Sequence, residues 1–391
     1  MFKKTLAGLA VAGLFSGAAM AADVNVYGVV DLGLMYQHTK QDVLSADDVS
    51  ADKDNSFTMK SGQNAGSRFG LRGSEDLGNG LTVSFKLENG FDADSGKLGN
   101  DGRLFGREAQ VTLAGAFGQV SFGRMGGVAS AAGTYDYVFA NGDAFDGFDN
   151  SVGALVTSSR YDNMITYQTP EFGGMKVLAQ YSFKNETVKT DIGSEGKSDT
   201  NRYASLAAVG QYGNLNLVAA YELQNFARED GKVQPDDQHT FYVGGNYDFG
   251  VTKVFGMAQH FAGARSLNGF DVARDTVTAG KTDASDGFRG WGATIGAQTP
   301  VAGGLLTTAF YYVDATVEGK ITNSAYGLTT ARETVGEADY NYYGLAARYE
   351  YSLSKRTTAY AGAGYAKEKV ENEGKMDADL VQAYVGLKHT F

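Results

Sequence analysis

Residues 76–88 decide the fold, and their sequence is DLGNGLTVSFKLE. The last eight residues alternate between apolar and polar side chains. The apolar set is Leu81, Val83, Phe85 and Leu87, and the polar set is Thr82, Ser84, Lys86 and Glu88. A period of two is typical of a β-strand with one apolar and one polar face. The glycine-rich DLGNG before it is typical of a tight turn. The stretch therefore predicts a turn that leads into an amphipathic strand.

The same unit of turn and strand recurs along the chain. Alternation is present in residues 175–181, 215–224 and 381–391. Tight-turn sequences occur at residues 76–80, 116–118, 170–174, 212–214, 248–250, 300–304 and 352–355. They alternate with long polar connections at residues 39–62, 184–199, 228–238, 265–286 and 318–339. Seven tight turns imply eight hairpins, so we predict an all-β fold of sixteen antiparallel strands.

The composition excludes several classes of protein. The 391 residues include 53 Gly, 23 Tyr, 23 Phe, one Trp and no Cys, and the mean hydropathy is −0.26. That mean is too polar for a bundle of membrane helices, and the aromatic content argues against a disordered chain. Without cysteine the chain has no disulfide, thiolate metal site or thiol nucleophile. The formal charge of −11 disfavours a nucleic-acid partner.

The N-terminus predicts a cleaved signal peptide over residues 1–21. Lys3 and Lys4 precede an apolar run at residues 6–15, and residues 19–21 are AMA, which suits signal peptidase. Residues 22–391 then carry 32 basic and 45 acidic side chains, a formal charge of −13. No later stretch has the about 18 uncharged apolar residues of a membrane helix. A membrane form of this protein must therefore cross the bilayer with strands.

Strands that cross a bilayer must pair every backbone N–H and C=O group, which only a closed sheet achieves. Alternating short and long connections, an even strand number and apolar-out, polar-in alternation describe an outer-membrane β-barrel. Sixteen strands leave a water-filled lumen. A soluble protein of several Greek-key domains is the main alternative, but the hairpin rhythm continues without a linker from Val24 to Phe391. We therefore predict a single transmembrane barrel domain over residues 22–391.

Several motifs resemble the Gram-negative general (diffusion) porins. They are SRFGLRGSEDLGNGL from Ser67, VYG at residues 26–28 with Asp31, GRMGG from Gly123, RYDNMITYQTPEFGG from Arg160, and YVGLKHTF at residues 384–391. The resemblance covers essentially the whole mature chain. It implies a homotrimeric outer-membrane channel for ions and small hydrophilic solutes, with short periplasmic turns, long extracellular loops and a third loop folded into the lumen. It also implies that Phe391 is an assembly signal.

The resemblance places a constriction loop at residues 127–159. Four acids and no basic residue lie in this segment: Asp136, Asp143, Asp146 and Asp149. On an exposed loop these carboxylates would be ordinary solvated charges. On an inserted loop they would line one wall of a pore eyelet. We expect the inserted arrangement on the strength of the family resemblance.

A basic wall is expected opposite these acids. Strand alternation directs Arg68 and Arg72 into the lumen, with Phe69 on the outer face. The same alternation directs Arg160 inward and Tyr161 outward. A standing field between arginines and carboxylates would then orient polar solutes in the eyelet.

Strand alternation directs two further arginines outward. The resemblance implies that Arg107 joins Arg68 and Arg160 in the basic cluster, whereas simple alternation directs Arg107 outward. Arg124 shares the parity of Phe122, which would place its charge on the outer face. Because a charge at the bilayer midplane costs about 2–4 kcal/mol, we expect Arg124 at the membrane edge or at a subunit contact.

No cofactor, metal site or enzymatic activity is predicted. The four histidines lack metal-ligand spacing, and they are His38, His239, His260 and His389. A barrel lipase with a Ser-His-Asp triad is an alternative, but the chain has no G-x-S-x-G motif.

Two channel functions remain open from the sequence. One is nonspecific diffusion, and the other is a solute-specific channel on the same barrel; adhesion through the long loops is compatible with both. The excess of Asp and Glu favours cations modestly, while arginines at the eyelet oppose that preference. The expected partners are other copies of the chain, outer-membrane lipid, ions and small solutes.

Overall fold

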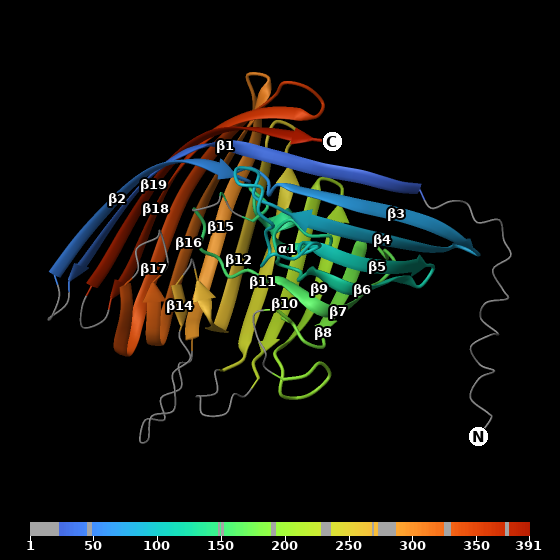
Figure 1. Ribbon diagram of the computed structural model, residues 1–391, viewed down its shortest axis with the longest axis horizontal. Helices are drawn as coiled ribbons and strands as arrows, with labels where there is room; N and C mark the ends of the chain where they lie inside the picture. Colours follow the sequence, from blue (N-terminus) through green and yellow to red (C-terminus); the bar gives the residue numbers. More distant parts are fainter. Residues whose placement is uncertain are drawn as a thin grey trace.

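The computed structural model describes residues 23–44, 49–147, 149, 152–188, 193–227, 236–267, 270–272, 287–323, 330–371 and 375–391. The predicted signal peptide lies outside these residues. Within them, nineteen strand segments form one antiparallel sheet that closes on itself around a short helix, α1 (Val138–Gly142) (Figure 1).

The strand bounds follow the chain in order. The first ten segments are β1 Asp23–Leu44, β2 Val49–Ser61, β3 Arg68–Gly78, β4 Leu81–Gly90, β5 Glu108–Gly115, β6 Gly118–Gly126, β7 Arg160–Gln168, β8 Met175–Ser182, β9 Arg202–Tyr212 and β10 Leu215–Asn225. The remaining segments are β11 Gln238–Asp248, β12 Lys253–Ala264, β13 Ser266–Leu267, β14 Phe270–Val272, β15 Gly287–Val301, β16 Gly304–Asn323, β17 Thr330–Ser352, β18 Thr357–Glu371 and β19 Lys375–Thr390.

These nineteen segments make a barrel of sixteen strands, as the sequence predicted. β2 and β3 both pair with β1 along its length, so together they form one interrupted barrel strand. β13 and β14 are a short extra pair between β12 and β15, which also pair directly. The seven tight turns fall between β3 and β4, β5 and β6, β7 and β8, β9 and β10, β11 and β12, β15 and β16, and β17 and β18.

The two ends of the chain close the barrel. β1 pairs with β19 from Val29↔Thr390 to Leu44↔Lys375, and Figure 1 shows the blue first strand beside the red last strand. Beyond this ladder, Gly28 and Phe391 exchange two backbone hydrogen bonds of 3.1 Å. A Cβ atom on Gly28 would lie 2.3 Å from the Phe391 ring and 2.7 Å from the carbonyl oxygen of Arg68. Closure therefore requires glycine here, and it leaves no free edge.

The strands place apolar side chains on the outside of the barrel. Val243 in β11 is 62% exposed while its neighbour Tyr242 is 3% exposed, and Leu345 in β17 is 57% exposed while Ala346 is 1% exposed. Exposed apolar residues on a closed barrel suit a lipid environment. No helix in the described part of the chain is long and apolar enough to span a membrane.

Two of the predicted long polar connections are shorter than expected, because the strands on either side continue into them. β1 and β2 stay paired up to Leu44↔Val49, inside the expected loop 39–62, and β16 and β17 stay paired up to Asn323↔Thr330, inside the expected loop 318–339. Ladder hydrogen bonds join backbone groups and need no apolar side chains, so polar hairpins continue the strands where the hydropathy pattern fades. Much of the connections at 228–238 and 265–286 lies outside the described residues.

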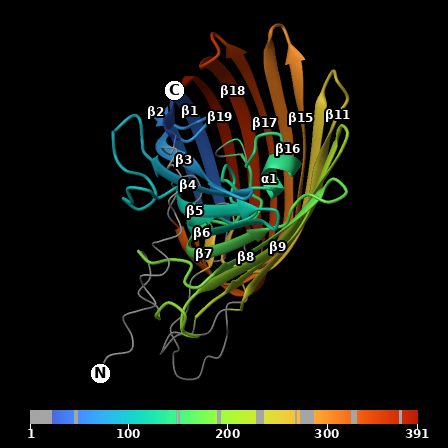
Figure 2. The ribbon, with the colours of Figure 1, turned by 90° about the vertical axis from the view of Figure 1, so that its right-hand side faces the viewer.

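The described part of residues 127–159 (127–147, 149 and 152–159), here called the inner segment, lies inside the barrel (Figure 2). It connects β6 to β7 and includes α1, which Figure 2 shows enclosed by the strands. Val138, Phe139 and Val152 are fully buried in one apolar cluster that also contains barrel residues such as Tyr311 and Tyr340. The inner segment therefore packs one of its sides against the inner wall formed by β10 to β19.

Candidate functional site

The packed side of the inner segment is fixed by two buried carboxylates. Asp143 accepts hydrogen bonds from Tyr311 Oη at 2.9 Å and from the Gly147 N–H at 2.9 Å. Asp149 accepts from Tyr384 Oη, which lies 2.7 Å from each carboxylate oxygen. Both aspartates are at most 1% exposed. They anchor the segment to β16 and β19, so the expectation that they line an acidic wall is wrong.

A third aspartate stabilises the inner segment internally. Asp136 is buried and accepts from the backbone N–H groups of Ala132 at 2.7 Å and Phe139 at 3.2 Å. Short carboxylates satisfy nearby backbone donors readily, and a sequence does not show which donors come close. Asp146 differs, because its side chain is exposed. The predicted acidic wall therefore reduces to Asp146.

Burial changes how these acids titrate. Burial, as the largest cause, raises the pKa of Asp149 to about 6, although the hydrogen bond from Tyr384 opposes that rise. Burial, and then the charge of Asp146, raise the pKa of Asp136 well above its usual range. Partial desolvation by the surrounding protein also raises the pKa of Asp146, although its side chain stays in contact with water. The negative charge that the segment presents is therefore smaller than four aspartates suggest.

Arg107 points inward, in the direction that the family resemblance implies. Its Nε donates to Glu88 at 2.6 Å, and its Nη2 lies 3.4 Å from the Ala132 carbonyl oxygen of the inner segment. Arg107 precedes the first residue of β5, so strand alternation does not govern it. The next residue, Glu108, accepts from the N–H of Thr134 at 2.6 Å. Barrel wall and inner segment are thus joined by polar contacts here.

Arg68 and Arg72, expected on one wall, line two different cavities. Arg68 Nε lies 3.9 Å from Glu88, and its Nη1 donates to the Gly66 carbonyl oxygen at 3.2 Å. The Arg72 guanidinium lies 5.0 Å from the centroid of the Tyr27 ring, a cation–π contact. Both face the lumen, in agreement with strand alternation.

Arg160 lines neither of these cavities, and its strand does not alternate as expected. Its Nε has no hydrogen-bond partner in the described chain. Tyr161 was expected outside, yet it is buried and stacks on Tyr203 at 4.1 Å. The cause is a β-bulge: the register between β6 and β7 shifts, and Asn163 has a φ of 52°. A bulge reverses the side-chain parity beyond it.

Arg124 lies beside the same bulge, and its charge is paired within the chain. Arg124 donates to Asp162 Oδ1 at 2.6 Å and to the Gly106 carbonyl oxygen at 2.8 Å. Asp162 also pairs with Arg103 at 2.7 Å and accepts from the Thr187 N–H at 3.0 Å. The charge is therefore neutralised within the chain, and it needs no subunit contact. This buried cluster ties the stems of the inner segment to the connections on either side.

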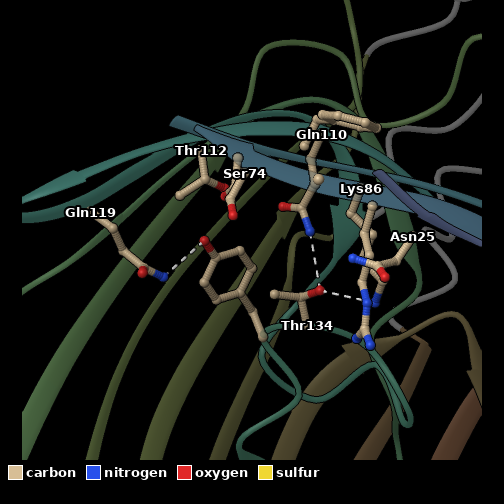
Figure 3. Close-up of a pocket in the computed structure, with 12 residues that line it drawn as sticks. Asn25, Ser74, Lys86, Gln110, Thr112, Gln119 and Thr134 are labelled. Carbon is tan, nitrogen blue, oxygen red and sulfur yellow. Dashed lines mark hydrogen bonds between the residues drawn. The ribbon is translucent and has the colours of Figure 1, made fainter. Parts of the chain in front are cut away.

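Two cavities flank the inner segment, each of about 390 Å³. The first, here called the link cavity, is lined by the β2–β3 link, Arg68, Asp146, Arg348, Glu350 and Lys388. The second, here called the wall cavity, lies against β3 to β6 and contains Arg72 and Lys86 with the inner-segment residues Thr134 and Tyr135 (Figure 3). The link bends inward because Asp31 Oδ2 accepts from the N–H groups of Asn64 at 3.2 Å and Ala65 at 2.9 Å.

Sequence reasoning missed several charged residues of these cavities. The alternation of residues 81–88 directs Lys86 and Glu88 inward on the polar face of β4, but it does not indicate a role for them. Glu350 accepts from Lys388 at 3.1 Å and lies 3.6 Å from Arg348. These three residues come from β17 and β19, so only the closure of the barrel brings them beside β3.

Similarity to known proteins identifies the family of this chain. Residues 8–391 match the Gram-negative porin family, so the chain belongs to that family. It is 33% identical over 402 residues to an outer membrane porin protein of Bordetella pertussis, and the alignment covers 100% of both chains.

Solved structures share the fold. An anion-selective porin from Comamonas acidovorans superposes with a TM-score of 0.62 at 23% identity, over 95% of this chain and 100% of that chain. OmpT of Vibrio cholerae, in a trimer form, gives a TM-score of 0.53 at 16% identity, over 93% of this chain and 99% of that chain.

The family and the fold define the general function. The protein is an outer-membrane porin of a Gram-negative cell, and its barrel forms a water-filled channel for passive diffusion of ions and small hydrophilic solutes. No group of three or more potential metal ligands occurs among the described residues.

Proposed function

We propose that the inner segment narrows this channel. We further propose that the charged side chains exposed in the two cavities beside it give a modest preference for small anions. The observation that supports this is the distribution of exposed charge. Of the charged side chains that line the two cavities, Arg72 and Asp146 are exposed, and the partly exposed ones are the cations Arg68, Lys86 and Lys388 and the acid Glu350. Asp143 and Asp149, by contrast, are buried against tyrosines.

Local charge matters more than the total of −13. The Debye length is about 8 Å at physiological ionic strength, so loop acids beyond that distance act weakly on an ion at the constriction. Two charges several ångströms apart in water interact by about 1 kcal/mol or less. Such a field biases passage without trapping the solute, which suits a diffusion channel. The relative from Comamonas acidovorans, described as anion-selective, is consistent with this proposal.

The test is the zero-current potential across planar bilayers that separate two KCl concentrations. We expect the natural protein to favour chloride, Arg68→Gln to reduce that preference, and Asp146→Asn to increase it. Arg356→Gln is the matched control, because Arg356 is exposed in the β17–β18 turn, outside both cavities. All effects should shrink in concentrated KCl. A potassium preference, or an Arg68 variant that behaves like the Arg356 variant, would overturn the proposal.

We further propose a homotrimer that acts without catalysis and is exported through a signal peptide at residues 1–21. The exposed apolar outer face offers surface for both lipid and neighbouring copies. Phe391, through its bonds to Gly28, is the proposed assembly signal. Chemical crosslinking in detergent should give a species of three chains, and N-terminal sequencing of the mature protein should start at Ala22. A monomer under these conditions would contradict the trimer.

A further inference from the structure

The wall cavity contains a cation without an acidic partner. Arg72 forms no ion pair with a carboxylate in the described chain, and its contact is the Tyr27 ring, whose Oη donates to Glu88 at 2.9 Å. The ring restrains the guanidinium without neutralising it. An arginine held in this way presents a planar set of donors that matches a carboxylate in two parallel hydrogen bonds.

Lys86, the second cation of the cavity, already has acidic partners. Its Nζ lies 2.5 Å from Glu108 Oε2 and 3.7 Å from Glu88 Oε2, and it donates to Thr134 Oγ1 at 3.3 Å. Figure 3 shows Lys86, Asn25 and Thr134 together on one side of the cavity. Asn25 is opposite Arg72 in the β1–β3 register. The charge of Arg72, which no carboxylate in the described chain neutralises, therefore lies on the same side of the cavity.

Apart from Gly73 and Phe85, the other residues that line the cavity carry uncharged hydrogen-bonding side chains. The side chain of Gln110 donates from Nε2 to Thr134 at 3.1 Å, while its buried Oε1 has no hydrogen-bond partner in the described chain. Gln110 is 7% exposed. In Figure 3 this oxygen is directed toward the side of the cavity where Ser74 and Thr112 lie. A buried acceptor without a partner costs free energy, so this oxygen favours a ligand that donates to it.

We propose that the wall cavity binds small hydroxylated carboxylates, such as sugar acids, on their way through the channel. The carboxylate pairs with Arg72, and a hydroxyl group donates to Gln110 Oε1. A volume of about 390 Å³ accommodates a molecule of this size. A neutral sugar lacks the group that Arg72 recognises, and acetate lacks the donor for Gln110. This inference rests on the proposed function, since the solute reaches the cavity through the lumen.

The experiment is block of KCl conductance in planar bilayers by D-gluconate. We expect gluconate to reduce the current saturably, whereas acetate and glucose at equal concentrations do not. Arg72→Gln should raise the half-blocking concentration about tenfold, because a charge-assisted pair is lost. Gln110→Leu should raise it about threefold to tenfold through the loss of one acceptor. Arg356→Gln should leave the block unchanged, and heat-modified mobility on gels checks that each variant folds.

The outcomes separate this inference from the proposed anion preference. Gln110→Leu removes no charge, so it should weaken the gluconate block far more than it changes the zero-current potential. A current that falls linearly with gluconate, an equal block by acetate, or a block that survives both cavity variants would each overturn the inference while leaving the anion preference intact. A potassium preference together with the expected gluconate block would instead contradict only the proposed function.

Discussion

Both sides of the inner segment contain aspartates, but these aspartates have different surroundings and different roles. On the packed side, α1 and Val152 lie against apolar wall residues, and Asp143 and Asp149 are enclosed with tyrosine hydroxyls. On the cavity side, Asp146 keeps an exposed side chain, and Arg72 of the facing strand β3 is exposed in the wall cavity. The packed side therefore contributes mainly to stability, and the cavity side mainly to selection among solutes.

The difference shows that residue type alone does not assign a role in a channel. A carboxylate that accepts two hydrogen bonds and is shielded from water acts as an anchor. A carboxylate that stays in contact with water contributes to the field in the lumen. Four predictions test this division, in order of their expected effect on stability.

The largest effect is expected for Phe139→Ala, at the centre of the packed side. Phe139 in α1 is fully buried, and truncation of a buried Phe typically costs about 3–5 kcal/mol. The inner segment should loosen, so that urea unfolds the barrel earlier and single-channel conductance rises or fluctuates. Phe172→Ala is the control, because Phe172 is exposed in the β7–β8 turn. Equal effects of both substitutions would show that the packing does not hold the segment.

Asp149 is expected to make the free energy of unfolding depend on pH, by an amount similar to the loss expected for Phe139→Ala. Its pKa is about 6 in the folded protein, against an ordinary value of 3.8. The folded state then binds the proton more tightly, so the free energy of unfolding decreases as pH rises from 4 through 6, by about 3 kcal/mol in total, and stays level above that range.

The measurement for Asp149 is urea unfolding across this pH range. Asp149→Asn cannot titrate, so the difference between the natural protein and this variant isolates the contribution of Asp149 from that of other buried acids. A difference that does not change between pH 4 and 7 would show that Asp149 is not shielded from water.

A smaller loss is expected when one anchoring hydroxyl is removed. Tyr311→Phe removes one side-chain donor from the buried Asp143, and such a loss costs about 1–3 kcal/mol. The adjacent Tyr312→Phe is the control, because its hydroxyl makes only a 3.5 Å contact with Asp314. Unfolding in urea compares the two, and an equal change in both would remove the special role of Tyr311.

The smallest change in stability is expected on the cavity side. Lys388→Gln removes a partly exposed partner of Glu350, and pairs of this kind contribute about 0–1 kcal/mol. The zero-current potential in a KCl gradient should nevertheless shift toward potassium, because the link cavity loses a positive charge. A large loss of stability without a shift in potential would reverse the assignment of the two sides.

Much of the architecture was predictable because it repeats. The alternation in residues 81–88 and the tight turns recur around the whole barrel, so the strand number follows from local patterns. The prediction failed where a single residue breaks the repeat. Asn163 adopts a positive φ within a bulge, and this reverses the direction of Tyr161. Nothing in the alternation of residues 160–168 indicates that bulge.

The candidate site was less predictable because its members meet through closure. Arg68 and Arg72 could be directed inward from parity alone. Asp143 and Asp149 were misassigned, since their partners Tyr311 and Tyr384 lie more than 160 residues further along the chain. Glu88 of β4 and Glu108 of β5 belong to the site because the inner segment folds back into the barrel beside them.

Local sequence patterns were sufficient for the class of fold, the order of strands and turns, and the inward direction of Arg68 and Arg72, because a period of two is a local property of extended chain. The tertiary structure decided which charges stay exposed. Whether an aspartate faces water or a tyrosine depends on which distant strands lie across the lumen, and that is fixed only when β1 pairs with β19 and the inner segment packs inside.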